Sequence, residues 1–130
     1  MARTPKQVIE DHYAAGARGD LDGMIADFAD DIEWTEAAGF PLAGTYHGPQ
    51  TVKTEIFLGL GRDWDNWHPE IDQLVADGET VVALGWYVGT HLRTGKTVRP
   101  RVAHVWVVRD EKVVRFEQIT DTLPVDQASR

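Results

Sequence analysis

A carboxylate occupies a position where an apolar side chain is expected. Residues 31–36 alternate as a half-buried strand does, and Glu36 falls on the same face as Ile32 and Trp34. A carboxyl group in an apolar interior is costly unless it is paired, protonated or used. Burial also raises the pKa of a carboxyl group from about 4.3 toward the range in which it serves as a general base. Glu36 is therefore the first candidate for a catalytic residue.

Three helices are expected to help position Glu36. The first has a strong start signal, because Thr4 and Gln7 can form a capping box and Pro5 suits the first helical position. The second shows helical spacing of apolar residues, and the third follows a loop rich in glycine and proline. The predicted caps or first residues are Thr4, Asp20 and Pro49, and the predicted ends are Gly19, Asp30-Asp31 and Gly59 to Gly61.

The rest of the chain has the pattern of antiparallel strands joined by turns. Asp77-Gly78 is a common hairpin signal, and a second turn is expected at residues 93–96. The four predicted strands cover roughly residues 67–75, 80–92, 97–108 and 112–122. With the strand that carries Glu36, they predict an α+β fold in which a curved sheet wraps over the helices and leaves a cavity between them.

Length and composition exclude several classes of function. The 130 residues suit one domain spanning 1–130, and the formal net charge of -8 argues against nucleic acid as a partner. Without cysteine there is neither a disulfide nor a thiolate metal site, and the histidines lack HxxxH spacing. We therefore expect neither a metal ion nor a cofactor. No apolar run approaches the ~20 residues of a membrane span, so we expect a cytoplasmic protein with no membrane partner.

Several runs of the sequence resemble the ketosteroid isomerase branch of the NTF2-like superfamily. Gly19-Asp20-Leu21-Asp22-Gly23 and Phe28-Ala29-Asp30-Asp31, ahead of the Glu36 strand, are close to that branch, and SnoaL-like polyketide cyclases carry looser versions. The resemblance implies a cone-shaped α+β fold, with three N-terminal helices packed on a strongly curved antiparallel or mixed sheet around an apolar pocket. It also implies a homodimer.

The family's catalytic positions are only partly kept in this chain. Glu36 falls where the isomerases have an aspartate general base. Their two oxyanion donors, a helical tyrosine and a protonated aspartic acid, fall on His12 and Ala103. Tyr13 lies about 100° further round the helix and is not assigned to the pocket. Steroid isomerisation itself is therefore not expected, and His12 either fills the core or donates a hydrogen bond to an oxyanion.

Two charged residues have alternative interpretations. Arg101 shares the strand parity of Ala103, and hence the expected pocket face. There it would either pair with Glu36 and lower the pKa of that carboxyl, or bind a substrate carboxylate or enolate. Asp121 resembles the end-of-strand acid/base aspartate of the SnoaL-like cyclases. Its parity places it on the opposite face unless a bulge or the end of the strand turns it inward.

Aromatic and polar side chains are expected to hold a ligand. Trp34, Trp86 and Phe116 would form apolar walls, a role that is compatible with membership of the core. The polar residues expected beside them are Thr90, Gln118 and Thr120. His104 and Trp106 fall on the face opposite Ala103, where the dimer contact is expected.

Three functions remain open from the sequence. The first is an isomerase or cyclase acting on a small apolar, polyketide-like or steroid-like carbonyl compound, with Glu36 as base and His12 as oxyanion donor. The second is a ligand carrier without catalysis, in which Arg101 locks Glu36 in its charged form. The third is a water-activating epoxide hydrolase or dehydratase, which needs Asp121 turned inward beside His12.

Overall fold

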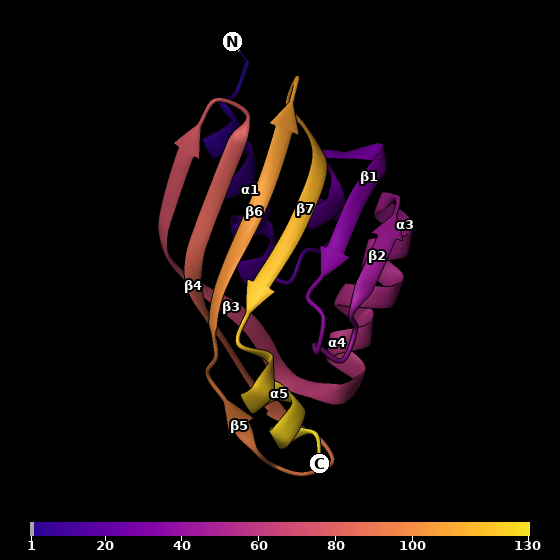
Figure 1. Ribbon diagram of the computed structural model, residues 1–130. Coiled ribbons are helices and arrows are strands. Elements are labelled where there is room, and N and C mark those ends of the chain that lie inside the picture. The colour runs from indigo at the N-terminus through magenta and orange to yellow at the C-terminus, as the bar shows by residue number, and fades with distance from the viewer. Residues whose placement is uncertain (1) are drawn as a thin grey trace.

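The computed structural model describes residues 2–130 and shows a curved seven-stranded sheet with helices packed along one face (Figure 1). The helices are α1 (Pro5–Ala17), α2 (Leu21–Ile25), α3 (Pro49–Thr51), the π-helical η1 (Val52–Phe57), α4 (Leu58–Asp63) and α5 (Thr122–Ala128). The strands are β1 (Phe28–Glu36), β2 (Gly44–His47), β3 (Trp64–Asp77), β4 (Thr80–His91), β5 (Thr97–Val98), β6 (Arg101–Arg109) and β7 (Lys112–Thr120). The predicted α+β class is confirmed.

The sheet is mixed, because one pair of neighbouring strands is parallel. The strand order is β2-β1-β7-β6-β4-β3, with β5 paired to β4 at the side. β1 and β7 run in the same direction, with Trp34 opposite Phe116, whereas the other pairs are antiparallel. The parallel pair brings the end of β1, at Glu36, to the same end of the sheet as the last residues of β7 (Figure 1).

The predicted capping box of the first helix is confirmed. The Thr4 hydroxyl accepts a hydrogen bond from the Gln7 backbone N–H at 3.2 Å, and the Gln7 side chain accepts one from the Thr4 N–H at 2.8 Å. The second helix is shorter than predicted. It ends at Ile25, and the apolar residue at its expected end, Phe28, instead pairs with Val113 as the first residue of β1.

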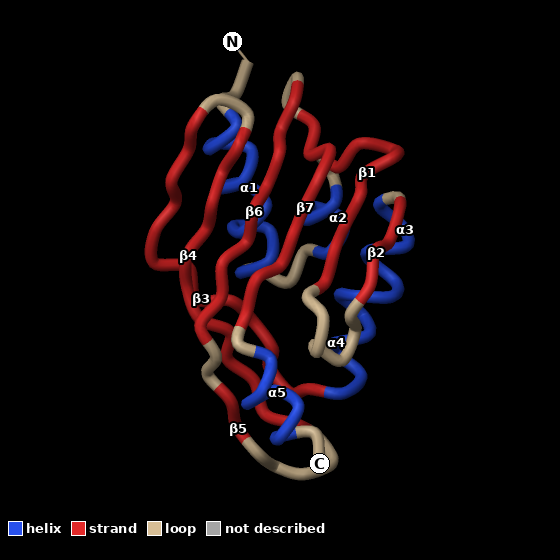
Figure 2. Tube along the Cα trace, in the orientation of Figure 1, coloured by secondary structure: helices blue, strands red, loops and turns tan. Residues whose placement is uncertain are grey.

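The predicted strands are present, with two elements that the prediction lacked. Figure 2 shows strand along almost the whole of 64–77 and 80–91, whereas the expected strand 97–108 is divided into β5 and β6. Pro100 lies at the break, and proline has no N–H to donate to a ladder. The short strand β2 and the C-terminal helix α5 were not predicted. The third helix begins at Pro49, as expected, and continues past Gly59 and Gly61 to Asp63.

The expected pocket face of β4 and β6 was wrong by one residue. The side chains that β6 buries are Val102, His104, Trp106 and Val108, and those that β4 buries include Val81, Ala83 and Tyr87. Ala103 therefore faces outward and His104 faces the helices. A strand alternates with a period of two, so a shift of one residue exchanges the two faces completely.

Glycines on the inner face of β4 allow β3 to bend tightly across it. A Cβ atom on Gly85 would collide with the backbone of Glu70 and Ile71, next to a register shift between the two strands. A Cβ atom on Gly89 would lie 2.7 Å from the ring of Trp67. These close approaches curve the sheet around its inner face.

Valine and isoleucine side chains fill the space between helices and sheet together with a group of aromatic rings. Trp34 stacks on Phe116 with ring centroids 3.7 Å apart, and Trp106 packs against both Phe116 and His12. A second, smaller cluster around Phe40 lies toward the end of the sheet covered by α5. No helix among residues 2–130 combines the length and the apolar character needed to cross a membrane.

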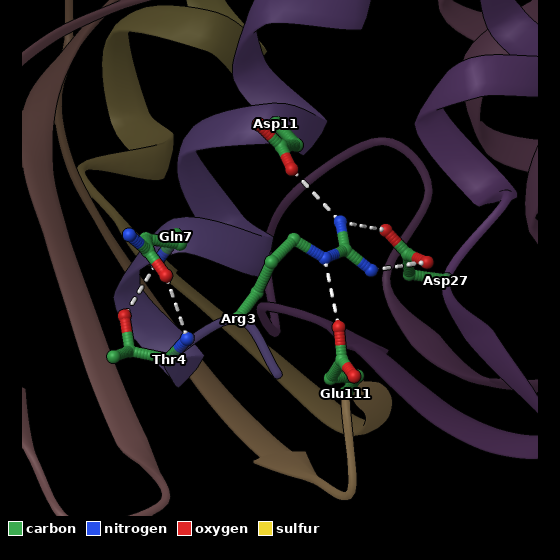
Figure 3. A network of polar contacts seen from close by, with 6 residues as sticks. All are labelled: Arg3, Thr4, Gln7, Asp11, Asp27 and Glu111. Carbon is green, nitrogen blue, oxygen red and sulfur yellow. Dashed lines mark hydrogen bonds and ion pairs between the residues drawn. The ribbon is translucent and has the colours of Figure 1, made fainter. Parts of the chain in front are cut away.

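Arg3 ties the opposite end of the molecule together. Its guanidinium contacts three carboxylates, two oxygens of Asp27 at 2.9 Å, Asp11 at 2.8 Å and Glu111 at 2.9 Å (Figure 3). Asp11 belongs to α1, Asp27 to the segment before β1 and Glu111 to the turn between β6 and β7. The Arg3 clamp, as we call these four residues, joins three elements through one planar side chain.

Candidate active site

Glu36 is buried without a cation. It ends β1, its exposed fraction is 3 %, and the ion pairs formed within residues 2–130 leave it without a basic partner. Burial raises the pKa of the Glu36 carboxyl to about 8, because removal from water disfavours the charged form. The carboxyl group is therefore poised to exchange a proton near neutral pH, as the strand parity predicted.

Trp34 lies beside Glu36 on the same face of β1. Its indole N–H opposes the rise of the Glu36 pKa, since a nearby donor favours the carboxylate. Yet the Trp34 Nε1 atom is buried and, within residues 2–130, makes no hydrogen bond of good geometry. A buried N–H without an acceptor is uncommon in folded proteins. This donor and the Glu36 carboxyl therefore lie side by side as two buried polar groups at the end of β1.

A chain of hydrogen bonds crosses the interior from β6 to the end of β1. The buried hydrogen-bond chain consists of Trp106, Tyr13, His104, Tyr87 and Gln118. The Trp106 N–H donates to the Tyr13 hydroxyl at 3.0 Å, and that hydroxyl lies 2.6 Å from Nδ1 of His104. On the other side of the imidazole, the Tyr87 hydroxyl lies 2.6 Å from Nε2.

Gln118 connects this chain to the backbone next to Glu36. The Gln118 Nε2 atom donates to the Tyr87 hydroxyl at 2.9 Å, and its Oε1 atom accepts from the backbone N–H of Ala37 at 3.0 Å. The N–H of Ala37 can only donate, so it fixes which end of the amide faces Tyr87. One amide group thus separates the Tyr87 hydroxyl from the peptide that follows Glu36.

Burial keeps the members of the chain uncharged. It lowers the pKa of His104 to about 3, with a smaller contribution from His12. It also raises the pKa of Tyr13 and of Tyr87 well above the usual 10, and the charge of Glu36 adds to the rise at Tyr87. Near neutral pH the imidazole is therefore neutral, and both tyrosines keep their hydroxyl hydrogens.

His12 is buried as expected but is not available as an oxyanion donor. Its Nδ1 atom lies 2.9 Å from the backbone carbonyl of Met24, so the Nδ1–H donates there and Nε2 is left as an acceptor. Burial lowers the pKa of His12 to about 4, which keeps the ring neutral. The ring packs among Tyr13, Phe28 and Trp106. The structure thus favours the core role.

Arg101, Trp86 and Thr90 lie on the outer face and not in the expected pocket. The Arg101 guanidinium forms an ion pair with Asp72 at 3.1 Å and stacks 4.8 Å from the centre of the Trp86 ring. Thr90 shares a hydroxyl hydrogen bond with Thr97. Arg101 therefore does not lock Glu36. The cause is the same one-residue error in strand parity that misplaced Ala103.

Asp121 does not turn inward, and Thr120 is used structurally. Asp121 is exposed and precedes α5 as its N-cap residue. The Thr120 hydroxyl donates to the backbone carbonyl of Arg101 at 2.8 Å. Of the candidates on β7, Phe116 and Gln118 do lie in the interior as predicted.

Tyr13, Tyr87, His104 and Trp106 belong to the site although the sequence interpretation left them out. The alternation of Val102, His104, Trp106 and Val108 is a clear strand pattern, and it was assigned to the wrong side of the sheet. The polar residue in the middle of that pattern was the available signal, because a buried histidine needs partners on both ring nitrogens.

Neither of the two best-formed hollows within residues 2–130 is lined by Glu36. The two best-formed hollows within residues 2–130 are open depressions of about 440 and 360 Å³, one beside the Arg3 clamp and one between α1 and β3. The same part of the chain holds no group of three or more potential metal ligands. Aromatic rings, among them Trp34, Trp106 and Phe116, pack in the part of the interior where the apolar cavity was expected.

A family model for the SnoaL-like domain matches residues 9–116. The chain belongs to the SnoaL-like family. Among solved structures, an NTF2-like protein from Burkholderia thailandensis is 51% identical, with a TM-score of 0.96 and 98% of each chain covered. TerC, crystallised with polyporic acid, is 26% identical with a TM-score of 0.87, over 96% of this chain and 97% of its own. The SnoaL-like fold predicted from the sequence runs is thereby confirmed.

The curated relatives match only part of this SnoaL-like chain. Patulin synthesis protein F from Aspergillus clavatus is 36% identical over 85 residues, which are 63% of this chain and 42% of that protein. The corresponding protein of Penicillium expansum is 34% identical over the same shares. The aligned part therefore spans less than half the length of the curated relatives.

Proposed function

We propose that this SnoaL-like protein is an enzyme of the isomerase or cyclase type. In this proposal, Glu36 removes a proton from the carbon next to the carbonyl group of a small, largely apolar compound. The observation that carries the proposal is the buried Glu36 carboxyl, which no ion pair within residues 2–130 reaches and whose pKa is raised to about 8. A base works best when its pKa lies near the working pH, and Glu36 meets that condition.

The proton transfer is reversible and needs no cofactor. The Glu36 carboxylate takes the α-proton, the electrons of the C–H bond form a C=C bond, and the carbonyl electrons move onto oxygen. The carboxylic acid so formed returns the proton to the same carbon, to a conjugated carbon, or to a new position after ring closure. Because Glu36 must be ionised to start, the rate should rise with pH up to about 8 and then level off.

Two alternative functions are less well supported. A simple carrier would be favoured by an ion pair between Glu36 and Arg101, but Arg101 pairs with Asp72 on the outer face. A water-activating enzyme would need Asp121 beside His12, but Asp121 is exposed and the Nδ1 atom of His12 is engaged with a backbone carbonyl.

The similar proteins support a small organic ligand. The name of one curated relative assigns it to patulin synthesis, and one solved neighbour was crystallised with an organic acid. A small apolar, polyketide-like or steroid-like carbonyl compound is consistent with the aromatic surroundings of Glu36. The Glu36 carboxyl and the Trp34 indole N–H would then form hydrogen bonds with an oxygen-bearing ligand.

A ligand must displace protein side chains to reach Glu36. The segment 37–43 follows Glu36 directly and places Phe40 against Tyr87, with ring centroids 6.3 Å apart, and against Trp67 at 5.8 Å. Its neighbours Gly39 and Pro41 are exposed, whereas Phe40 is buried. We propose that outward movement of Phe40 opens the site. The buried Phe40 ring lies between Glu36, the last residue of β1, and the exposed residues Gly39 and Pro41.

Exchange of α-protons with heavy water tests the proposed function without a known product. A panel of cyclic ketones and 1,3-diketones is incubated with the protein in D₂O, and loss of the α-proton signal is followed by NMR. Glu36→Gln should slow enzyme-dependent exchange by at least about 100-fold, the usual contribution of a general base. Glu33→Gln, on the exposed face of the same strand, is the matched control. If exchange by Glu36→Gln equals that of the wild type, Glu36 is not the base.

The expected homodimer remains a proposal, with a different surface from the one that strand parity suggested. The stripe containing His104 and Trp106 is buried inside the protomer, so it is not the contact. On the outer face, Leu84, Ala103 and Ile119 lie side by side across three strands, and Ile119 is 52% exposed. Ile119→Asp should convert the dimer to a monomer in light-scattering measurements. A monomeric wild type would refute the proposal.

A further inference from the structure

The indole N–H of Trp34 is a buried donor without an acceptor. Among the buried side-chain nitrogen and oxygen atoms of residues 2–130, the Nε1 atom of Trp34 is the one that makes no hydrogen bond. The indole of Trp106, in the same core cluster, does find a partner and donates to the Tyr13 hydroxyl at 3.0 Å. A donor that leaves water without gaining an acceptor is costly, so the Trp34 N–H needs a physical explanation.

Four aromatic rings fix the direction in which the Trp34 N–H points. Phe116 stacks on the indole at a centroid distance of 3.7 Å and an angle of 20°. Phe57 and Trp106 meet it edge-on at 5.6 and 5.7 Å, and Phe28 packs against it at 5.7 Å. Protein interiors are close-packed, so a rotation of the indole would displace these rings. The N–H therefore cannot turn toward a distant acceptor, and its partner must lie beside it.

Glu36 is the acceptor beside this N–H. It follows Trp34 by two residues on the same face of β1, and both side chains are buried. Burial raises the pKa of the Glu36 carboxyl, and the Trp34 N–H opposes that rise as a hydrogen-bond donor does. A carboxylate accepts a hydrogen bond roughly twice as strong as a neutral group does. The N–H thus gains a strong partner only when Glu36 is ionised.

We propose that Trp34 is a positioning residue for Glu36, and that its indole N–H donates a hydrogen bond to the ionised carboxyl group and is released when that group takes up a proton. The catalytic part of this inference rests on the proposed function, in which Glu36 is the base. The N–H orients the carboxylate before it removes a proton, and correct orientation is a large part of such a step. An N–H without an acceptor is the arrangement expected when Glu36 is protonated.

The buried groups around Glu36 do not titrate in the same pH range. Burial lowers the pKa of His12 to about 4 and that of His104 to about 3, so both rings are neutral above pH 6. Burial also raises the pKa of Tyr46 and of Tyr87 above the usual 10, and the charge of Glu36 adds to both rises. A change at the Trp34 N–H between pH 6 and pH 9 therefore reports on Glu36.

The indole signal measures the proposed bond in the unaltered protein. With ¹⁵N-labelled tryptophan, the Nε1–H signal of Trp34 is followed by NMR from pH 6 to pH 9, together with the ¹³C shift of the Glu36 carboxyl. The indole proton should move downfield with the same midpoint as the carboxyl, because it gains a charge-assisted hydrogen bond. The Nε1–H signal of Trp106, which has its own acceptor, should stay fixed.

Two variants assign that movement to Glu36. Glu36→Gln should abolish it. Glu55→Gln should leave it unchanged, although Glu55 is the other carboxylate whose charge acts on Tyr46. A Trp34 signal that stays fixed while Glu36 titrates, that moves with a different midpoint, or that still moves in Glu36→Gln would overturn the proposal. So would a Glu36 carboxyl that does not titrate in this range.

Removal of the N–H alone tests its effect on the base. The amino acid 3-benzothienylalanine, incorporated at position 34, keeps a bicyclic aromatic ring and replaces the N–H by sulfur. Without the donor, the titration midpoint of Glu36 should rise by about one pH unit, and the pH profile of α-proton exchange should move with it. The same amino acid at position 106 is the matched control, since Trp106 donates to Tyr13. Equal midpoints for the unaltered protein and the protein altered at position 34 would contradict the role of Trp34.

The two proposals fail in different ways. If the Trp34 signal follows the titration of Glu36 but Glu36→Gln retains α-proton exchange, the base role is wrong and the hydrogen bond stands. If Glu36→Gln loses exchange while the Trp34 signal does not depend on pH, only the role of Trp34 is wrong.

Discussion

The two ends of β1 place carboxylates in opposite surroundings. At its start, Asp27 receives two hydrogen bonds from Arg3, which also contacts Asp11 and Glu111 (Figure 3). At its end, Glu36 is almost fully buried, and the ion pairs in the described part of the chain do not include it. The Arg3 contact lowers the pKa of the Glu111 carboxyl, whereas burial raises that of Glu36 to about 8. The nine-residue strand β1 thus begins beside a structural ion cluster and ends at a buried acid with a raised pKa.

The difference teaches which carboxylates can do chemistry in this fold. A carboxylate held by a guanidinium stays charged and accepts hydrogen bonds, so it stabilises the junction of three elements. A carboxylate without that partner exchanges its proton near neutral pH, at a cost in stability. The proposed role of Glu36 as a base therefore depends as much on the lack of an ion pair to it within residues 2–130 as on the carboxyl group itself.

The largest expected effect is on the pH dependence of the free energy of unfolding, when Gln replaces the ionisable Glu36. Its pKa is about 8 in the folded protein and 4.5 in the unfolded chain, so the folded protein binds the extra proton between these values. The Glu36 carboxyl should therefore make the free energy of unfolding fall as pH rises from 5 to 9, by up to roughly 5 kcal/mol. Below about pH 6.5 the lowered pKa values of His12 and His104 act in the opposite direction, so the fall is measured as the difference between the wild type and a Glu36 variant. Glu36→Gln, which resembles the protonated acid, should remove this fall.

Urea unfolding at pH 5, 7 and 9 measures this dependence. Glu33→Gln again serves as the control, since Glu33 is exposed on the same strand. A Glu36→Gln protein with the same pH dependence as the wild type would show that the buried carboxyl is not the group responsible.

A smaller loss is expected when the Arg3 clamp is opened. Arg3→Gln leaves Asp27, Asp11 and Glu111 close together without their shared cation. Since these side chains are partly exposed, the free energy of unfolding should fall by only about 1 kcal/mol, with a smaller loss in high salt. Arg109→Gln, which breaks a single exposed pair with Glu79, should have no measurable effect. Equal effects of the two variants would contradict a cooperative clamp.

The smallest effect is expected at Arg101, where an alternative from the sequence can be tested. Because Arg101 pairs with Asp72 on the outer face, Arg101→Gln should move the titration of Glu36 by no more than about 0.3 pH unit, since exposed charges are screened. Carboxyl ¹³C shifts of Glu36 measure that titration. A rise of a full unit would mean that Arg101 does act on Glu36.

Much of the fold was predictable because its signals are local. The capping box at Thr4, the start at Pro49 and the burial of Glu36 follow from residue types within a few positions. The helix α5 was missed because Asp121 was assigned to a strand end. A local pattern predicts a short element such as α5 only when the end of the preceding strand has been assigned correctly.

The polar half of the site was not predictable because it depends on which face of a strand is inside. The pattern around His104 fits either face, and the choice that placed Ala103 in the pocket moved Tyr87 and Trp106 out of it. In the folded protein, the contact of His104 with Tyr13 shows which face of β6 is inside. These two residues lie 91 positions apart in the sequence. A long-range contact of this kind leaves no trace in a short window of sequence.

The close approach at Gly89 has a consequence for protein engineering. With no side chain there, the ring of Trp67 fits against β4 and packs 4.8 Å from the ring of Tyr87. One side chain from β3 therefore packs directly beside the ring of Tyr87. Shortening residue 67 would widen the space beside Tyr87 while leaving Glu36 and the buried hydrogen-bond chain in place. In the proposed function, the residue that limits the size of the ligand would thus differ from the residue that removes the proton.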